Sequence, residues 1–333
     1  MKQLVTVLCG TCLLTFFAYG ESTKLSLHVW NRHTFTMIGD SIKENTSAIK
    51  RGYLSIKHKF TDKIKVRFTL DFFSSDDYKY GAGIKLKYGY VDIERPIAIP
   101  SAKLTFGLIK TYFGKTYDWT YPTITKVLEE KEKLVASADY GMAMFGYLPR
   151  GYGEYALSIL NGEGYKKTGD KVNIYPAYVA NIRVIPIPGI TIGGSLFYEK
   201  AGIGKYEKRL LYAGMVQLIR RPFSLLVEYL RKYDSSTSEG YMVVSTLTLR
   251  ETTDRMVELV ARYDKWDEDI HQSNDAHSRI TVGSNWHILP PHKGKPTLML
   301  QVNWEHTEFE NANKPEDRVM LQLRWVISTK ISR

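Results

Sequence analysis

Apolar and polar residues alternate along most of this chain. From Ile64 to Phe72, every even-numbered position is apolar and every odd-numbered position is polar or charged. Successive side chains of a β-strand point to opposite faces, so such a segment has one apolar and one polar face. Because about sixteen such segments follow one another without a helical stretch between them, the sequence predicts an all-β fold, a closed transmembrane antiparallel β-barrel with a wet interior.

The expected strands have the length that a tilted strand needs to cross a bilayer, mostly about 9 to 11 residues. They are predicted at 24–36, 48–60, 64–72, 83–93, 102–111, 139–148, 153–160, 177–185, 189–199, 209–219, 223–231, 240–250, 255–263, 278–288, 296–305 and 317–327. Short and long connections alternate, which is typical of periplasmic turns and extracellular loops. We therefore expect both termini in the periplasm.

The longest predicted connection, the third long loop, runs from Tyr112 to Ala138 and mixes lysine with glutamate. We expect it to fold into the lumen and narrow it, with a short helix over Val127 to Leu134. A solvated flap outside the barrel is the alternative.

The first twenty residues have the features of a secretory signal. Lys2 is followed by an apolar run from Leu4 to Phe17 and then by small residues before Glu21. We therefore expect a signal peptide at 1–20, a barrel domain at 21–333 and export to the bacterial outer membrane; a membrane anchor is the alternative. Both cysteines, Cys9 and Cys12, fall in the signal, which removes disulfides and cysteine chemistry from the exported chain.

The chain is basic, with a formal net charge of +11, and many of its cations fall at positions of inward parity. The predicted pore-lining cations are Arg51, Lys65, Arg67, Lys85, Lys87, Lys103 and Arg183, together with Lys126 of the third long loop. Such a lumen concentrates small anions, because walls of low dielectric constant focus the field along the water column. We expect Arg51, Arg67, Lys85 and Lys87 to form one patch; pairing with inward acids such as Asp71 is the alternative.

No sequence motif of an enzyme is present: there is no nucleophile elbow, no zinc-binding His-Glu-x-x-His and no phosphate-binding glycine-rich loop. We therefore expect a porin without catalysis, cofactor or metal, and no nucleic-acid partner. Two alternatives remain open at this point, an outer-membrane enzyme of the phospholipase type and a structural or adhesion barrel with a plugged lumen.

Several strings resemble the phosphate-selective porin O and P family of outer-membrane channels. They are Lys50 to Leu54, Lys103 to Lys110, Asp139 to Gly141, Asn161 to Gly164 and Glu258 to Asp264. The resemblance implies a sixteen-stranded, commonly trimeric barrel whose third loop folds inward and which passes phosphate or polyphosphate through a lipopolysaccharide-containing membrane.

Within that resemblance, the family's anion-contacting pair falls on Lys50 and Arg51, and the lysines of the long loop, including Lys126, correspond in place. Two departures stand out. The family's basic pair is usually two arginines, whereas in this chain the first of the pair is Lys50. A lysine lacks the bidentate geometry of a guanidinium. The family usually ends on an aromatic residue, whereas six residues follow Ile327 here.

Overall fold

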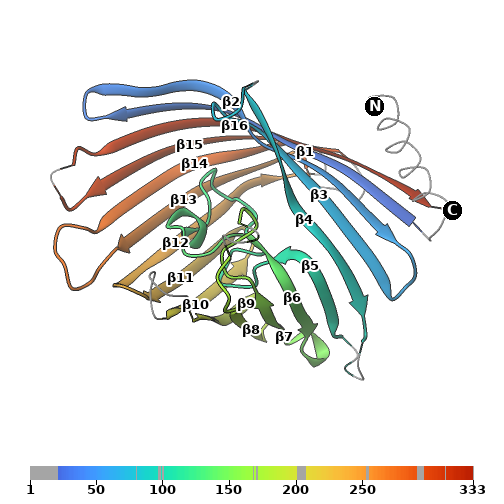
Figure 1. Cartoon of the computed structure of the whole chain (residues 1–333). Coiled ribbons are helices and arrows are strands. Elements are labelled where there is room, and N and C mark those ends of the chain that lie inside the picture. The colour runs from blue at the N-terminus through green and yellow to red at the C-terminus, as the bar shows by residue number, and fades with distance from the viewer. Residues whose placement is uncertain are drawn as a thin grey trace.

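The computed structural model describes residues 22–79, 81–96, 99, 101–167, 169, 172–200, 208–252, 255–290, 296–311 and 313–332. The predicted signal peptide lies outside these residues. The described chain forms a closed barrel of sixteen antiparallel strands (Figure 1). The strands are β1 (Ser22–Ile38), β2 (Ser41–Lys59), β3 (Ile64–Ser74), β4 (Ala82–Glu94), β5 (Lys103–Lys110), β6 (Ala138–Tyr147), β7 (Gly153–Leu160), β8 (Ala177–Ile187), β9 (Ile190–Glu199), β10 (Arg209–Arg220), β11 (Phe223–Tyr233), β12 (Thr237–Glu251), β13 (Met256–Asp267), β14 (His277–Leu289), β15 (Thr297–Phe309) and β16 (Glu316–Ser332).

Each strand pairs with its neighbours in sequence order, and β16 closes the barrel on β1 along their whole length, from Ser22 opposite Ser332 to Ile38 opposite Glu316. Residues 328–332 therefore continue the last strand. Closure satisfies the backbone groups between strands without a helix, which is what a bilayer requires of a β-structure.

All sixteen predicted strands are confirmed, and the largest difference is at β2, which begins at Ser41 instead of residue 48. Residues 41–47 are mainly polar on both faces, so they lack the alternation that marks a half-buried strand. The strand nevertheless forms there because Gly39, with a φ of +54°, makes a tight turn back from β1.

The outer surface of the barrel is apolar, as the alternation predicts. Residues expected to face lipid are among the large apolar side chains that the fold leaves exposed; they include Leu54, Phe68, Phe106, Leu259 and Leu321. No helix in the described part of the chain is long and apolar enough to span a membrane. A closed barrel with this exterior is consistent with the bacterial outer membrane.

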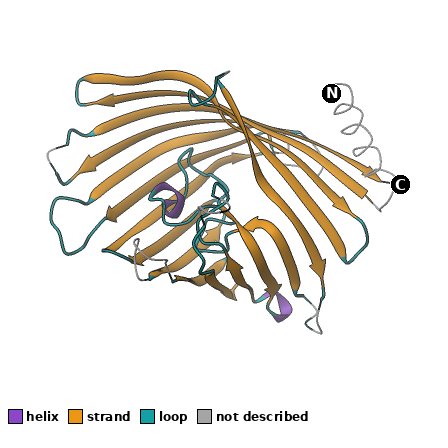
Figure 2. Cartoon of the chain, in the orientation of Figure 1, coloured by secondary structure: helices purple, strands orange, loops and turns teal. Residues whose placement is uncertain are grey.

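The connection between β5 and β6, residues 111–137, is here named L3, and it folds into the lumen as predicted. Figure 2 shows its single helical turn, α2 (Leu128–Lys131), inside the ring of strands. This helix is shorter than the predicted one. A second short helical element, η1 (Pro149–Gly151), lies in the turn between β6 and β7.

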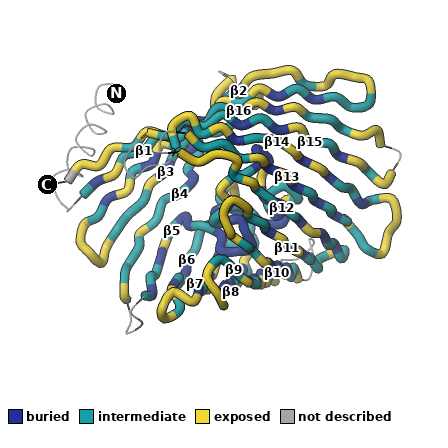
Figure 3. The backbone as a smooth tube through the Cα atoms, turned by 180° about the vertical axis from the view of Figure 1, so that it is seen from behind, coloured by how far each residue is buried: buried dark blue, intermediate teal, exposed yellow. Residues whose placement is uncertain are grey.

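L3 is held by a hydrophobic core built between the loop and one side of the barrel wall. From L3, Phe113, Val127 and Leu128 are fully buried. They belong to one cluster with wall residues, among them Ala143, Ala156, Val179, Phe197, Leu211, Met215, Leu226, Leu230, Met242 and Val244. Figure 3 shows this buried centre in dark blue. The inner faces of β6–β13 are thus covered by the loop, whereas β1–β5 and β14–β16 carry a more polar inner wall.

Candidate pore and its basic cavities

L3 crosses the lumen and is fastened to the far wall by polar contacts. The backbone N–H of Ile124 donates to Oδ1 of Asn303 at 2.6 Å, and the hydroxyl of Thr125 donates to Glu305 at 2.5 Å. Residues 121 and 122 accept further hydrogen bonds from amide side chains of β14 and β15. The loop is therefore attached to β14 and β15 as well as to its apolar bed.

Inward-facing arginines of β8 and β13 hold L3 in place through hydrogen bonds. Arg183 is only 5% exposed; it donates to both carboxylate oxygens of Asp118, at 2.7 and 3.2 Å, and to the carbonyl of Gly114 at 2.6 Å. Arg262 donates to the carbonyl of Lys126 at 2.7 Å and pairs with a carboxylate of its own strand, that of Asp264. Arg183 faces inward as predicted, but its charge is neutralised beneath the loop.

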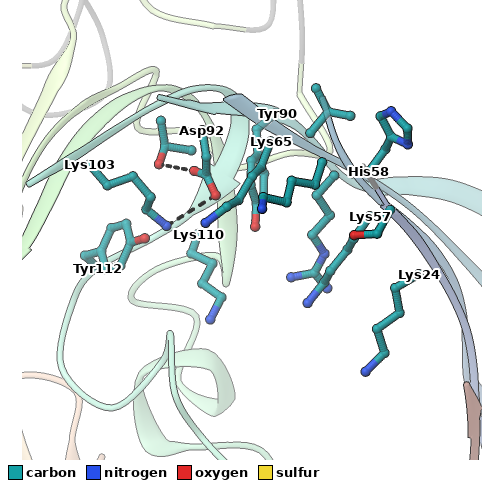
Figure 4. A pocket seen from close by; sticks show the side chains of 14 residues that line it. Lys24, Lys57, His58, Lys65, Tyr90, Asp92, Lys103, Lys110 and Tyr112 are labelled. Carbon is teal, nitrogen blue, oxygen red and sulfur yellow. Dashed lines mark hydrogen bonds and ion pairs between the residues drawn. The ribbon is translucent and has the colours of Figure 1, made fainter. Parts of the chain in front are cut away.

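A basic cavity of about 380 Å³ lies among β1–β5, at the end of the barrel that holds both termini. Four of its cations, Lys24, Lys57, Arg67 and Lys110, have no acidic partner among the described residues. Figure 4 shows the ammonium groups of Lys24 and Lys110 projecting away from the wall into the cavity.

Two further predicted site residues line this cavity but are ion-paired. Lys65 contacts Glu94 at 2.9 Å, and Lys103 contacts Asp92 at 3.3 Å. Their contribution to the field is therefore smaller than that of the four other cations.

A β-bulge at Lys87 determines which residues of β4 reach the lumen. Opposite β3, the register moves from Thr69–Tyr88 to Leu70–Leu86, which leaves Lys87 unpaired. Before the bulge, odd-numbered residues of β4 such as Lys85 therefore face the lumen, and after it even-numbered residues such as Tyr90 do. Lys87 and Tyr88, although adjacent in sequence, both lie inside, and Tyr88 packs under the guanidinium of Arg67 at 4.3 Å.

Arg51 occupies the place where L3 meets β1 and β2. Its guanidinium lies between two aromatic rings, 4.7 Å from that of Trp30 and 4.5 Å from that of Tyr121 in L3. It also donates to the hydroxyl of Tyr53 at 3.1 Å. Because aromatic faces are favourable partners for a cation but carry no net charge, the rings hold Arg51 in place without neutralising it.

The neighbouring Lys50 does not join Arg51 in one site. It is the extra residue of a second bulge, because Arg51 pairs with Trp30 and Ile49 with Asn31. Its ammonium group lies 3.7 Å from Glu44, nearer the opposite end of the barrel.

On the other side of L3, Lys85, Lys87 and Lys126 form a second basic region. Lys85 pairs with Asp71 at 3.2 Å, whereas Lys87 donates to the hydroxyl of Ser137 and lies 4.3 Å from the ring of Tyr165. Lys126 is exposed in a cavity of about 360 Å³ between L3 and residues 162–167.

One acid of L3 faces these cations. Burial works to raise the pKa of Glu130, but Lys126, Arg51 and Lys87 outweigh it and hold the pKa below its usual value. Glu130 is therefore ionised and offsets part of the local positive charge.

The predicted single patch of Arg51, Arg67, Lys85 and Lys87 is only partly formed. Arg51 and Lys87 both face Glu130, and Arg67 and Lys87 contact the same ring, that of Tyr88. Only Arg67 of the four lines the basic cavity, however, and Lys85 is paired with Asp71. The reason is the depth of L3, which enters between positions that parity alone places on one face. Sequence reasoning also missed Lys24 and Lys110 as members of a common cavity. The inward parity of Lys24 could have shown it, whereas Lys110 has the same parity as the outward-facing Phe106 of β5.

The fold resembles that of outer-membrane porins and channels of known structure. OprB of Pseudomonas putida matches with a TM-score of 0.66 and 8% identity, over 96% of each chain. OmpF of Salmonella typhi, solved with daunomycin, matches with a TM-score of 0.65 and 8% identity, over 92% of this chain and 98% of that one. The channel DcaP of Acinetobacter baumannii matches with a TM-score of 0.61 and 12% identity, over 93% and 100%.

At these identities the comparisons establish the fold. No protein-family model and no curated protein matches the sequence.

Proposed function

We propose that this chain is an outer-membrane porin that lets small anions, including phosphate-like ones, diffuse passively through a water-filled lumen. The observation that carries the proposal is the uneven division of the lumen by L3. The loop covers the apolar inner wall of β6–β13 and leaves the basic wall of β1–β5 lining the basic cavity.

Uncompensated charge on that wall is what favours anions over cations. A fully solvated cation attracts an anion at 4 Å by about 1 kcal/mol, and several times more where protein walls exclude water. Lys24, Lys57, Arg67 and Lys110 approach one cavity from four strands, so their fields add. The pore therefore attracts anions through the set, not through one residue.

Ion conductance of the mature chain in planar bilayers tests the proposal. A reversal potential in a KCl gradient should show preference for chloride, and a variant with Lys57, Arg67 and Lys110 all replaced by glutamine should lose most of it. Arg221→Gln is the matched control, because it removes a cation from an exposed turn, where Arg221 pairs with Glu251 at 2.5 Å. A barrel without conductance would contradict the proposal and favour a plugged barrel, or an enzyme if it hydrolyses phospholipid.

The finer assignments belong to the same proposal. Phosphate or polyphosphate as the natural solute, a homotrimer and contact with lipopolysaccharide follow from the resemblance to the phosphate-selective porin O and P family. Block of chloride current by added inorganic phosphate tests the first, and the size of the detergent-solubilised assembly tests the second. Removal of residues 1–20 on export is tested by the N-terminus of the outer-membrane form.

A further inference from the structure

A second cavity opens at the termini end of the barrel, across the lumen from the basic cavity. It measures about 580 Å³ and lies between L3 and side chains of β10–β16 that face the lumen at that end. We name it the amphipathic cavity, because apolar and polar side chains both contribute to its surface.

Apolar side chains form much of its wall. They come from six strands and from L3, and include Leu226, Val244, Met256, Met299 and Trp119. Water-filled lumens of porins are ordinarily polar. Leu226, Val244 and Trp119 are nearly buried beneath the loop, but Met256 and Met299 are only partly covered and remain in contact with the lumen. Covering such a hydrated apolar surface with an apolar group is favourable.

The charges that line this cavity are mostly paired. Lys115 lies 2.5 Å from Asp118. Nε2 of His287 lies 3.0 Å from Glu258, a contact that balances the carboxylate charge when His287 is protonated. Arg324 is the remaining cation, and among the described residues it has no acidic partner. It is positioned by Trp30, whose ring lies 4.5 Å from its guanidinium carbon.

Arg324 also connects the two cavities. In the register of β1, Trp30 lies opposite Arg324 of β16, and Lys24, on the same inward face, lies opposite Lys57 of β2, so the amphipathic cavity adjoins the basic cavity across β16 and β1. The termini end of the lumen thus has a basic half and an apolar half that face the same water.

We propose that this end of the lumen binds organic anions that carry an apolar body, such as carboxylates with a short alkyl chain. The anionic group lies toward Arg324 and the basic cavity, and the alkyl chain lies on Met256, Met299 and the neighbouring apolar wall. This inference rests on the proposed anion channel and names a substrate class for it. Inorganic anions, phosphate included, use only the basic half and gain nothing from the apolar wall.

Chain length gives the test. We expect block of chloride current to strengthen from acetate to butyrate to hexanoate, by about two- to fourfold for each added methylene. The free energy of burying one methylene group corresponds to up to about that factor in affinity. Hexanamide, which has the same body without charge, should block much less than hexanoate. Equal block by the three acids, or equal block by hexanamide and hexanoate, would overturn the proposal.

Two variants assign the effect to the cavity. Met256→Gln with Met299→Gln keeps side-chain length and charge, so it should flatten the chain-length series while the reversal potential stays unchanged. Arg324→Gln should weaken block by every carboxylate. If the series persists in the methionine variant, partition into the bilayer explains it and the inference fails. If the unaltered protein lacks anion preference, the proposed function fails instead.

Discussion

Glu129 of L3 and Glu228 of β11 bury two carboxylates beside each other under Gly114. A Cβ atom at Gly114 would lie 2.1 Å from Oε1 of Glu129 and 2.8 Å from Oε1 of Glu228. Both side chains are fully buried, and neither oxygen of Glu228 has a hydrogen-bond partner among the described residues. Two buried carboxylates in this position cannot both be ionised, so at least one of them is protonated.

The protonation of this carboxyl pair predicts a pH dependence of L3 docking. Burial raises the pKa of Glu129 to about 7 from its usual 4.5, although hydrogen bonds from Lys115 and Thr116 oppose the shift. Lys115, Asp118 and Arg183 are the other charged groups that face the pair. Because the pKa is raised in the docked state, the stabilisation is greatest below pH 4.5, falls as the pH rises toward 7 and is constant above it.

Thermal unfolding of the detergent-solubilised barrel between pH 4 and pH 8, about the span of this titration, measures this dependence. We expect a fall in unfolding temperature across that range in the natural protein. Glu228→Gln keeps the shape but removes one of the two charges, so its curve should be flatter. An unchanged slope in the variant would show that the pair does not control docking.

Deletion of Thr125 to Lys133 should raise single-channel conductance without preventing assembly. The segment contains α2 and the two apolar anchors Val127 and Leu128, so its loss frees the cross-section that L3 now fills. The strands and their register do not depend on it. Unchanged conductance in planar bilayers would mean that the main current does not pass L3.

Arg183→Gln should destabilise L3 strongly, since it leaves the carboxylate of Asp118 with only Lys115 as a partner. Loss of one member of a fully buried ion pair costs about 3–5 kcal/mol; the cost here should be lower, because the Asp118 side chain is 35% exposed. The variant that adds both Asp118→Asn and Lys115→Gln should recover part of this, because it removes all three charges of the cluster together. Limited proteolysis within L3 reports the effect, and equal cleavage of the natural protein and Arg183→Gln would contradict it.

Gly114→Ala should also loosen the loop. Gly114 has a φ of +50°, which a residue with a side chain adopts at a cost, and the added methyl group would collide with the carboxylate of Glu129. We expect about 1–3 kcal/mol of destabilisation at such a position, seen as a lower unfolding temperature. Gly214→Ala is a suitable control, because a Cβ there meets no atom within 4 Å.

Alternation was sufficient to predict the strands and the lipid-facing surface, since both depend only on the parity of residues such as Leu54 and Phe68. It was insufficient for the site, because the bulges at Lys50 and Lys87 change parity within a strand and depend on pairing with a partner strand. The docking of L3 was partly visible. In Leu225-Leu226-Val227, both faces of β11 are apolar, which indicates a wall covered on the inside as well as the outside.

Because L3 docks on one side of the barrel, residues needed for packing and residues that face the water lie on different strands. Residues of β6–β13 that lie beneath the loop determine whether the barrel interior packs, so substitutions there should change folding and assembly together. Residues of β1–β5 face water beside the loop and tolerate replacement of one polar side chain by another. Related barrels could therefore acquire new solute preferences by changing the first third of the sequence while the remainder keeps the same architecture.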